Sequence, residues 1–465
     1  MKSKPSRRKF IATTIAGTVA SIVAPVAFAG ERSKLAGSNS AGTTDRSAAA
    51  TNDCNTTVTN ADRNTTVTNA NRNAAVTNAN RVAPPSFIIF PWGGMPGNPA
   101  NEPWGDLADM DAMMRDLYDC GFNTSGFTEI KNLRHARKNH LMGILSTAIN
   151  PTVETTQDKA NETIKTLLES ITDPDDRKAI YAIYLRDEPN ASLFPQLEVW
   201  SKAVKNQNIM PYINLFPDYA SSAQLGSNDY LEHLDQYVNI CHPPYISYDN
   251  YSLFEGGRLD ENRFFGNLES IRNKSLQADI PFWNVVLSNG HFSYAEPSDA
   301  TLAIQVYSTL AYGGKGIGYF TYYTPQVGNY RLAPIDRFGY RTKTWEMMRN
   351  INLQIHSLVP VYSRLKSINV FHTGDVPRNG QGPDSTKLTE SIKGASLLVG
   401  EFVDSAEKPY LMVVNKQMQS SIDFDVKLKN KGRMVIVSQF NQGLASFAGE
   451  QKWLAPGCGV LLTVE

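Results

Sequence analysis

Several features that would point to particular protein classes are scarce or missing in this 465-residue chain. The four cysteines (Cys54, Cys120, Cys241 and Cys458) are scattered and form no CxxC pair, which argues against a disulfide framework or a zinc site. The seven histidines show no HxH or HExxH spacing, so no metal cofactor is expected. Beyond the N-terminal segment no apolar run reaches the ~20 residues of a spanning helix, so no membrane span is expected after removal of that segment.

An excess of charge is also missing, because 45 basic residues balance 45 acidic ones. Residues 1–29 carry five basic side chains and no acidic one, so their removal would leave a mildly acidic protein. A mildly acidic body gives no electrostatic reason to bind nucleic acid.

The first 29 residues have the pattern of a targeting signal. Arg7 and Arg8 precede a weakly apolar run from Ile11 to Phe28, and Ala27-Phe28-Ala29 fits a cleavage site. A twin-arginine pair at this place is typical of Tat export. We therefore expect a Tat-type signal peptide at 1–29 and a periplasmic or secreted protein.

The composition of residues 30–84, which is rich in Asn, Thr, Ala and Ser, predicts a disordered linker. They contain three nine-residue repeats, which are Asn55–Arg63, Asn64–Arg72 and Asn73–Arg81. One valine per repeat buries too little surface to offset the entropy of ordering the chain.

From residue 85 to 358 the chain alternates strand-like apolar runs with helix-like segments. The eight runs are Phe87–Phe90, Phe122–Phe127, Leu141–Ala148, Ile180–Leu185, Met210–Leu215, Tyr245–Tyr248, Pro281–Leu287 and Gly316–Thr321. Eight such units over about 275 residues have the size of a (β/α)8 TIM barrel. The Gly313–Gly318 string stands between a helix and a strand, so we interpret it as a helix end and tight turn rather than a phosphate loop.

The pattern changes after the last predicted helix. Residues 359–465 show short alternating runs such as Tyr410–Val414, Ile422–Leu428, Met434–Ser438 and Gly459–Val464. Short alternating strands without helices predict a C-terminal antiparallel β-sandwich domain.

In a TIM barrel the active site forms at the carboxyl ends of the strands. The fourth strand ends in Asp187-Glu188-Pro189, and adjacent carboxylates directly after a buried strand are costly unless they serve a function. The sixth strand ends at Asp249, with Glu255 shortly after it. Amide and aromatic residues at the other strand ends would suit a sugar, whose CH faces stack on rings and whose hydroxyls need donors and acceptors. These candidate substrate-binding residues are Trp92, Asn214, Tyr248, Asn250, Tyr251, Trp283, Asn284, Tyr322 and Tyr323.

The region 85–465 resembles the clan-A glycoside hydrolases, and family forty-two β-galactosidases in particular. Asp187-Glu188-Pro189 is similar to the Asn-Glu-Pro of that clan, and the resemblance implies that Glu188 is the general acid/base. Pro281-Phe282-Trp283 and Ala311–Gly316 resemble that family's seventh and eighth strand regions. The family's nucleophile is a glutamate that closes the seventh strand, whereas this sequence reads Asn284-Val285-Val286-Leu287-Ser288 there.

Three hypotheses follow from the missing carboxylate. In the first, Glu188 acts with Asp249 or Glu255 as the second group. In the second, Asp187 and Glu188 support substrate-assisted cleavage of the N-acetylhexosaminidase type, with Tyr248 or Tyr251 holding the acetamide. In the third, the barrel binds carbohydrate without turnover. In each case Asp187 should raise the pKa of Glu188 by like-charge repulsion.

Overall fold

The apolar runs of the sequence form the strands of a closed parallel sheet in the computed structural model, which describes residues 85–93 and 109–465. The signal peptide and linker expected at 1–84 lie outside the described residues. The barrel strands are β1 (Ile88–Pro91), β2 (Thr124–Thr128), β3 (Met142–Leu145), β4 (Ile180–Asp187), β5 (Met210–Leu215), β6 (Ile246–Asp249), β9 (Phe282–Leu287) and β10 (Gly316–Phe320). They are hydrogen-bonded in the order β1-β10-β9-β6-β5-β4-β3-β2, which confirms the predicted barrel.

Asn123 closes the ring between the first and last strands of that order. Its backbone N–H donates to the carbonyl of Ile89 at 3.2 Å, and its Oδ1 accepts the N–H of Ile89 at 2.9 Å. Its Nδ2 donates to the carbonyl of Phe87 at 2.8 Å. The Asn123 side chain therefore makes hydrogen bonds that backbone groups would make if β1 and β2 were paired over a greater length.

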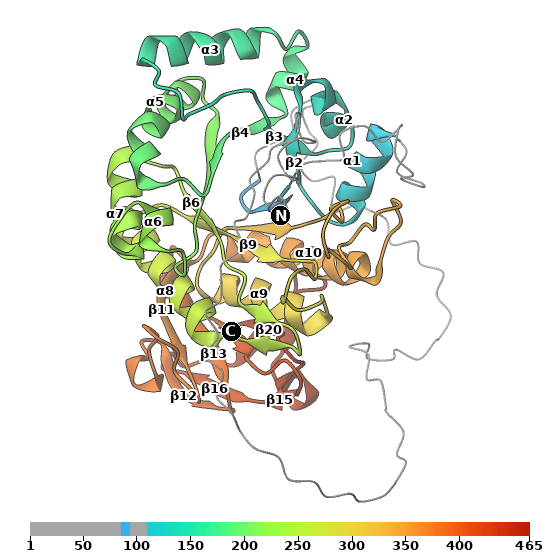
Figure 1. Ribbon diagram of the computed structural model, residues 1–465. Helices are drawn as coiled ribbons and strands as arrows, with labels where there is room; N and C mark the ends of the chain where they lie inside the picture. Colours follow the sequence, from blue (N-terminus) through green and yellow to red (C-terminus); the bar gives the residue numbers. More distant parts are fainter. Residues whose placement is uncertain (1–84, 94–108) are drawn as a thin grey trace, which may run out of the picture. The chain divides into compact units, whose positions relative to one another are not determined.

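Helices surround the barrel strands (Figure 1). They are α1 (Met110–Asp119), α2 (Leu133–Lys138), α3 (Gln157–Glu169), α4 (Pro174–Lys178), α5 (Phe194–Lys205), α6 (Ser222–Leu225), α7 (Tyr230–Cys241), α8 (Glu261–Ala278), α9 (Asp299–Ala311) and α10 (Lys343–Tyr362). The small hairpin of β7 (Leu253–Phe254) and β8 (Arg258–Leu259) follows β6. The predicted domain boundary at 358/359 falls inside α10.

Strand alternation decides which side chains enter the barrel. On β9, Trp283 and Val285 belong to the interior cluster, whereas Phe282 and Val286 pack against the helices. The interior is filled by large rings, and Trp283 stacks on Tyr245 with ring centroids 3.7 Å apart. The barrel is therefore a packed core below its open end.

The interpretation of Gly313–Gly318 as a helix end and turn is confirmed. Helix α9 ends at Ala311, Gly313 has φ +94°, and β10 begins at Gly316. A Cβ on Gly316 would lie 2.4 Å from Ile88 Cγ2, so a side chain does not fit there.

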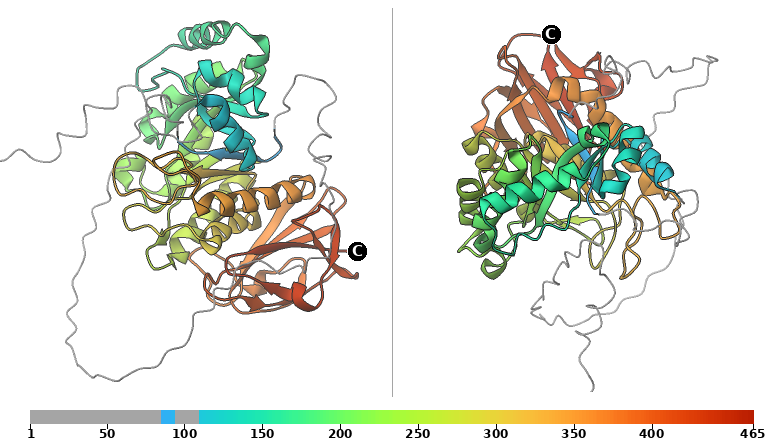
Figure 2. Two further views of the ribbon diagram at one scale, coloured as in Figure 1. Left: turned by 90° about the vertical axis from the view of Figure 1, so that its right-hand side faces the viewer. Right: turned by 90° about the horizontal axis from the view of Figure 1, so that it is seen from above.

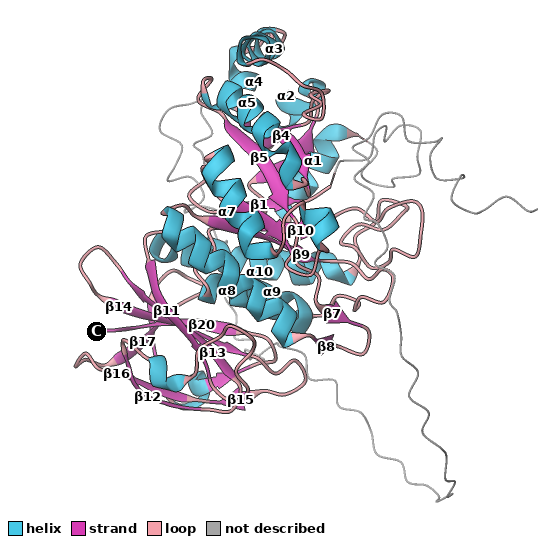
Figure 3. Cartoon of the chain, turned by 60° about the vertical axis from the view of Figure 1, so that its left-hand side comes forward, coloured by secondary structure: helices cyan, strands magenta, loops and turns pink. Residues whose placement is uncertain are grey.

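The C-terminal residues form two β layers (Figure 3). A six-stranded sheet runs in the order β11-β13-β14-β20-β17-β18, and the pairs β12-β16 and β15-β19 complete the sandwich, which confirms the predicted architecture. These strands are β11 (Lys366–His372), β12 (Thr389–Lys393), β13 (Leu397–Val403), β14 (Pro409–Asn415), β15 (Ile422–Asp423), β16 (Asp425–Leu428), β17 (Met434–Val437), β18 (Leu444–Ser446), β19 (Trp453–Leu454) and β20 (Gly459–Val464).

The six-stranded sheet is apolar on both faces because one face covers the barrel. Leu397 and Val399 point into the sandwich, whereas Leu398 and Phe402 join the core of the barrel helices. Figure 2 shows these C-terminal strands as a group beside the barrel elements. Arg272 of α8 donates to the Ser367 hydroxyl of β11 at 3.1 Å across this boundary.

Candidate active site

Three neighbouring strands bring two aspartates and an amide together at their carboxyl ends. Asn214 on β5 donates from Nδ2 to Asp187 Oδ1 on β4 at 3.2 Å and to Asp249 Oδ1 on β6 at 2.8 Å. Because both oxygens bond the same nitrogen, they are at most 6.0 Å apart. Asp187 and Asp249 therefore belong to one site, although 62 positions separate them in the sequence.

A hydrogen-bond chain fixes the orientation of the Asn214 amide. The Ser247 hydroxyl donates to Asn214 Oδ1 at 2.9 Å and lies 3.2 Å from the Tyr212 hydroxyl. Since Oδ1 is occupied as an acceptor, Nδ2 faces the two carboxyl groups. The Asn214 amide thus holds both aspartate side chains in place.

Glu188 follows Asp187 in an unusual backbone conformation. Its φ is +44°, a left-handed value that a non-glycine residue adopts at some cost in free energy. The Glu188 N–H donates to the carbonyl of Asn214 at 2.8 Å, and Pro189 follows directly. The turn therefore redirects the chain at the point where the strand leaves the sheet.

Burial raises the pKa of Glu188 well above its ordinary value, and the charges of Asp249 and Asp187 raise it further. Burial also raises the pKa of Asp249, with Asp187 as the second cause, while the hydrogen bond from Asn214 acts in the opposite direction. Three carboxyl groups this close cannot all ionise cheaply in a low dielectric. The protonated form of Glu188 is therefore favoured.

Aromatic rings stand beside the three carboxyl groups. The Tyr251 ring stacks on Phe320 with centroids 5.5 Å apart, and Trp92 meets Phe320 edge-on at 5.6 Å. Trp92 and Phe320 are both partly exposed, and the Trp92 Nε1 has no hydrogen-bond partner within the described part of the chain. The charges of Asp249, Asp187 and Glu188 all act on the Tyr251 hydroxyl, whose pKa is raised mainly by burial.

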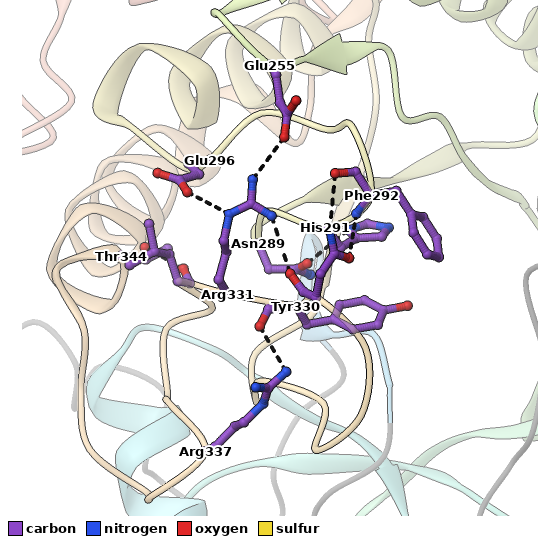
Figure 4. A network of polar contacts seen from close by, with 11 residues as sticks. Glu255, Asn289, His291, Phe292, Glu296, Tyr330, Arg331, Arg337 and Thr344 are labelled. Atoms are coloured by element: carbon purple, nitrogen blue, oxygen red, sulfur yellow. Dashed lines mark hydrogen bonds and ion pairs between the residues drawn. The ribbon is translucent and has the colours of Figure 1, made fainter.

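His291 extends this wall and remains neutral. Its ring stacks on Tyr330 at 4.7 Å and meets Tyr251 edge-on at 6.4 Å. Burial lowers the His291 pKa to about 4, and its Nδ1 bonds Asn289 Oδ1 at 2.9 Å. Figure 4 shows His291, Asn289 and Tyr330 together beside Arg331.

Glu255 occupies a different environment from the other predicted carboxylates. Its side chain is 60% exposed and pairs with Arg331 Nη2 at 3.2 Å, and Glu296 pairs with Arg331 Nε at 2.6 Å (Figure 4). This cluster lines a cavity of about 430 Å³. The carboxylates whose charges act on Glu188 are Asp249 and Asp187, whereas Glu255 lies in the separate cluster with Arg331 and Glu296.

Strand alternation places two predicted substrate-binding residues outside the barrel, which corrects those assignments. Ser247 and Asp249 face inward on β6, so Tyr248 points outward into the helix-packing core. Asn284 on β9 also faces outward and donates to Thr309 of α9 at 2.8 Å.

Four further predicted residues serve packing instead of the site. Trp283 lies in the closed interior of the barrel, stacked on Tyr245. Tyr322 is buried and accepts a hydrogen bond from Trp345 Nε1 at 2.8 Å, with the Tyr323 ring packed edge-on against it. Asn250 donates to Asn267 Oδ1 of α8 at 2.9 Å. Of the predicted binding residues, Asn214 and Tyr251 lie next to the carboxyl groups, and Trp92 packs against Phe320.

The structure adds Tyr219, Tyr294 and Phe320 to the site. The Tyr219 hydroxyl accepts the N–H of Tyr251 at 3.2 Å, and the charges of Asp249 and Glu188 act on Tyr294. Alternation on β10 pointed to Phe320, because Gly316 and Gly318 occupy the preceding inward positions. Tyr294 lies in the loop between β9 and α9, which has no periodicity, so the sequence carries no comparable signal for it.

The described residues hold no group of three histidine, cysteine, aspartate or glutamate side chains arranged to bind a metal ion. Within the same part of the chain, none of the helices has both the length and the apolarity needed to cross a bilayer.

Comparison with known proteins gives a likeness in fold. No protein-family model matches the sequence, and no curated protein matches it. A solved structure described as a glycoside hydrolase aligns over 82% of this chain and 92% of its own, with 12% identity and a TM-score of 0.50. A family 39 glycoside hydrolase from the gut symbiont Bacteroides cellulosilyticus WH2 aligns over 82% and 81%, with 12% identity and a TM-score of 0.47. A β-galactosidase from the psychrophilic Marinomonas ef1 aligns over 59% and 60%, with 7% identity and a TM-score of 0.42.

Sequence identities this low are evidence for a similar fold alone. The alignment with the first of these structures, which covers 82% of this chain, supports the fold described above.

Proposed function

We propose that this chain is an exported glycoside hydrolase that cleaves O-glycosidic bonds, with Glu188 as general acid/base and Asp249 as the second carboxylate. The observation that carries the proposal is the grouping of Asp187, Glu188 and Asp249 at the carboxyl ends of β4 and β6, beside a wall of aromatic rings. The likeness in fold to a solved structure described as a glycoside hydrolase supports the proposal by analogy. Export rests on the twin-arginine signal in the sequence.

The chemistry follows from the protonation states. Glu188 donates its proton to the glycosidic oxygen as the bond to the anomeric carbon breaks. Asp249, once ionised, accepts a proton from water or attacks the anomeric carbon itself, and water completes the cleavage to a free sugar and an alcohol. The partly exposed rings of Trp92 and Phe320 would stack on the CH face of the sugar.

A second candidate, substrate-assisted cleavage of 2-acetamido sugars, is favoured by the state of Asp249. Burial raises the pKa of Asp249, which favours its protonated, non-nucleophilic form, and Asp187, which precedes Glu188 in the chain, accepts a hydrogen bond from the Asn214 amide. In that mechanism Asp187 would orient the acetamido group, whose oxygen attacks the anomeric carbon. Tyr251 would hold the acetamide, since Tyr248 faces away from the site.

The proposal is tested with Glu188→Gln on a panel of aryl and alkyl glycosides. We expect a loss of about 10²–10⁴-fold in kcat on alkyl glycosides, as for the removal of a general acid. The loss should be smaller on nitrophenyl glycosides, because nitrophenolate departs without protonation. Glu255→Gln is the matched control and should retain wild-type kcat, since Glu255 is exposed and paired with Arg331.

Wild-type rates in Glu188→Gln, or inactivation by Glu255→Gln, would contradict the assignment. Activity confined to 2-acetamido sugars, with inhibition by a thiazoline analogue, would select the substrate-assisted candidate. Glycan binding without turnover in the wild type would show a carbohydrate-binding barrel instead of an enzyme.

A further inference from the structure

A loop of the C-terminal domain reaches the catalytic end of the barrel. Arg378, which follows β11, forms an ion pair through Nη2 with Asp218 Oδ2 on the loop after β5. The Arg378 N–H also donates to Asn262 Oδ1 at 2.8 Å, at the start of α8. The two domains therefore meet next to the strand ends that carry the carboxylates.

Asp218 is a buried carboxylate that depends on this contact. Its side chain is 5% exposed. Burial raises its pKa to about 6, while the charges of Arg378 and Arg263 oppose that rise and the charge of Asp260 adds to it. Loss of Arg378 would leave a buried carboxylate with one nearby cation fewer, which favours its protonation or displacement.

Two connections lead from Asp218 to the candidate active site. The Asp218 N–H donates to Asn267 Oδ1 at 3.1 Å, and the same oxygen accepts from Asn250, the residue after Asp249. The next residue, Tyr219, lies under the Arg263 guanidinium at 3.7 Å and accepts the N–H of Tyr251. The loops after β5 and β6 are thus joined by the Tyr219 side chain, which bonds the backbone of Tyr251, and by the Asn267 side chain, which bonds both loops.

We propose that Arg378 is a positioning residue, through which the C-terminal domain holds the Asp218–Tyr219 loop and thereby the loop that carries Asp249 and Tyr251. This inference rests on the proposed glycosidase function of that site. It assigns the β-sandwich a part in catalysis without requiring that it touch the sugar.

A second anchor separates positioning from simple domain docking. Lys416, whose side chain is fully buried, pairs with Glu261 at the start of α8 at 3.3 Å and donates to the carbonyl of Asp375 at 2.7 Å. These contacts do not involve Asp218. The C-terminal domain should therefore stay docked when Arg378 is removed.

The kinetic test compares Arg378→Ala, Asp218→Asn and the double variant. Each single change should lower kcat by about 10-fold with a smaller change in KM, because a misplacement of the carboxylate by a fraction of an ångström is costly. The double variant should be no worse than either single variant, since the two residues act as a unit. Arg378→Lys should recover part of the loss.

The matched control is Arg433→Ala, which breaks an exposed ion pair with Glu465 in the same domain. It should keep wild-type kcat. Wild-type kinetics in Arg378→Ala, additive losses in the double variant, or an equal loss in Arg433→Ala would overturn the inference.

A readout without substrate separates this inference from the proposed function. Hydrogen–deuterium exchange should become faster at residues 216–220 and 249–252 in Arg378→Ala, with β1 and β3 unchanged. Unchanged exchange in both loops would refute the coupling. If the wild type cleaves no glycoside, the proposed function fails, and faster exchange would still establish the link between the loops.

Discussion

At the scale of single residues, the site is defined by the carboxyl groups of Asp187, Glu188 and Asp249, which are largely shielded from solvent. Glu188 and Asp249 both have raised pKa values with burial as the first cause, and Asp187 adds like charge to each. Such an arrangement favours the protonated form of an acid, which a glycosidic leaving group requires. The same arrangement has a cost in stability.

We predict that Glu188→Gln makes the protein more stable at neutral pH. The folded-state pKa of Glu188 is above the unfolded value, so the stabilisation from its protonated form is complete below about pH 4.5 and is lost progressively as pH rises from there towards the folded pKa. A neutral glutamine avoids that loss, and a gain of about 1–2 kcal/mol is expected at pH 7. Thermal unfolding at pH 4 and pH 7 measures it; a gain that is equal at both pH values would contradict the charge explanation.

The pH dependence of activity should respond to Asp187. In the proposed mechanism the acid limb reports Asp249 losing its proton and the alkaline limb reports Glu188 losing its own, and both pKa values are raised. Because the Asp187 charge contributes to both shifts, Asp187→Asn should move both limbs of the kcat/KM profile to lower pH. Complete loss of activity in Asp187→Asn would instead indicate the substrate-assisted mechanism.

At the scale of elements, the barrel depends on a side chain to complete its sheet. Asn123 bonds the backbone of Ile89 and Phe87, where β1 and β2 meet. Without it, a backbone N–H and a carbonyl at the seam lose their partners, which costs about 1–3 kcal/mol each.

Asn123→Ala should therefore lower the free energy of unfolding by about 2–4 kcal/mol, as measured by urea denaturation. The exposed Asn430 offers a control, and Asn430→Ala should change stability by less than about 0.5 kcal/mol. A small effect in Asn123→Ala would mean that the seam is held elsewhere.

At the scale of the whole molecule, the C-terminal domain packs directly against the barrel helices. Glycines of the sandwich let its strands approach α9 closely, since a Cβ on Gly400 would lie 2.0 Å from the Ala311 carbonyl oxygen and one on Gly459 would lie 2.6 Å from the Tyr307 ring. The described face of this sheet is apolar and would be exposed if the domains parted.

Gly400→Ala should accordingly destabilise the joined domains by at least about 1–3 kcal/mol, because the clashing atom belongs to the helix backbone. Calorimetry should then show a lower or a divided unfolding transition. Gly382→Ala is the control, because its nearest contact would be an ordinary 3.7 Å from Val376. An unchanged transition in Gly400→Ala would disprove the tight contact.

The sequence determined the elements of this fold, because burial imposes a pattern on neighbouring residues. The eight apolar runs became the eight barrel strands, and Asp187-Glu188-Pro189 came to the end of β4 as expected. Strand β13 was harder to foresee, because both of its faces are buried and its run from Leu397 to Val403 does not alternate.

Only the tertiary structure decided which side chains share a site. Tyr248 and Asp249 are adjacent in the sequence, yet one packs against helices and the other meets Asp187 across Asn214. Glu255 is six residues from Asp249 and pairs with Arg331 on a distant loop. Alternation sends neighbouring side chains such as Tyr248 and Asp249 to opposite faces of a strand, but which face is inward and which partners meet there depend on strand pairing and tilt, which a local pattern does not encode.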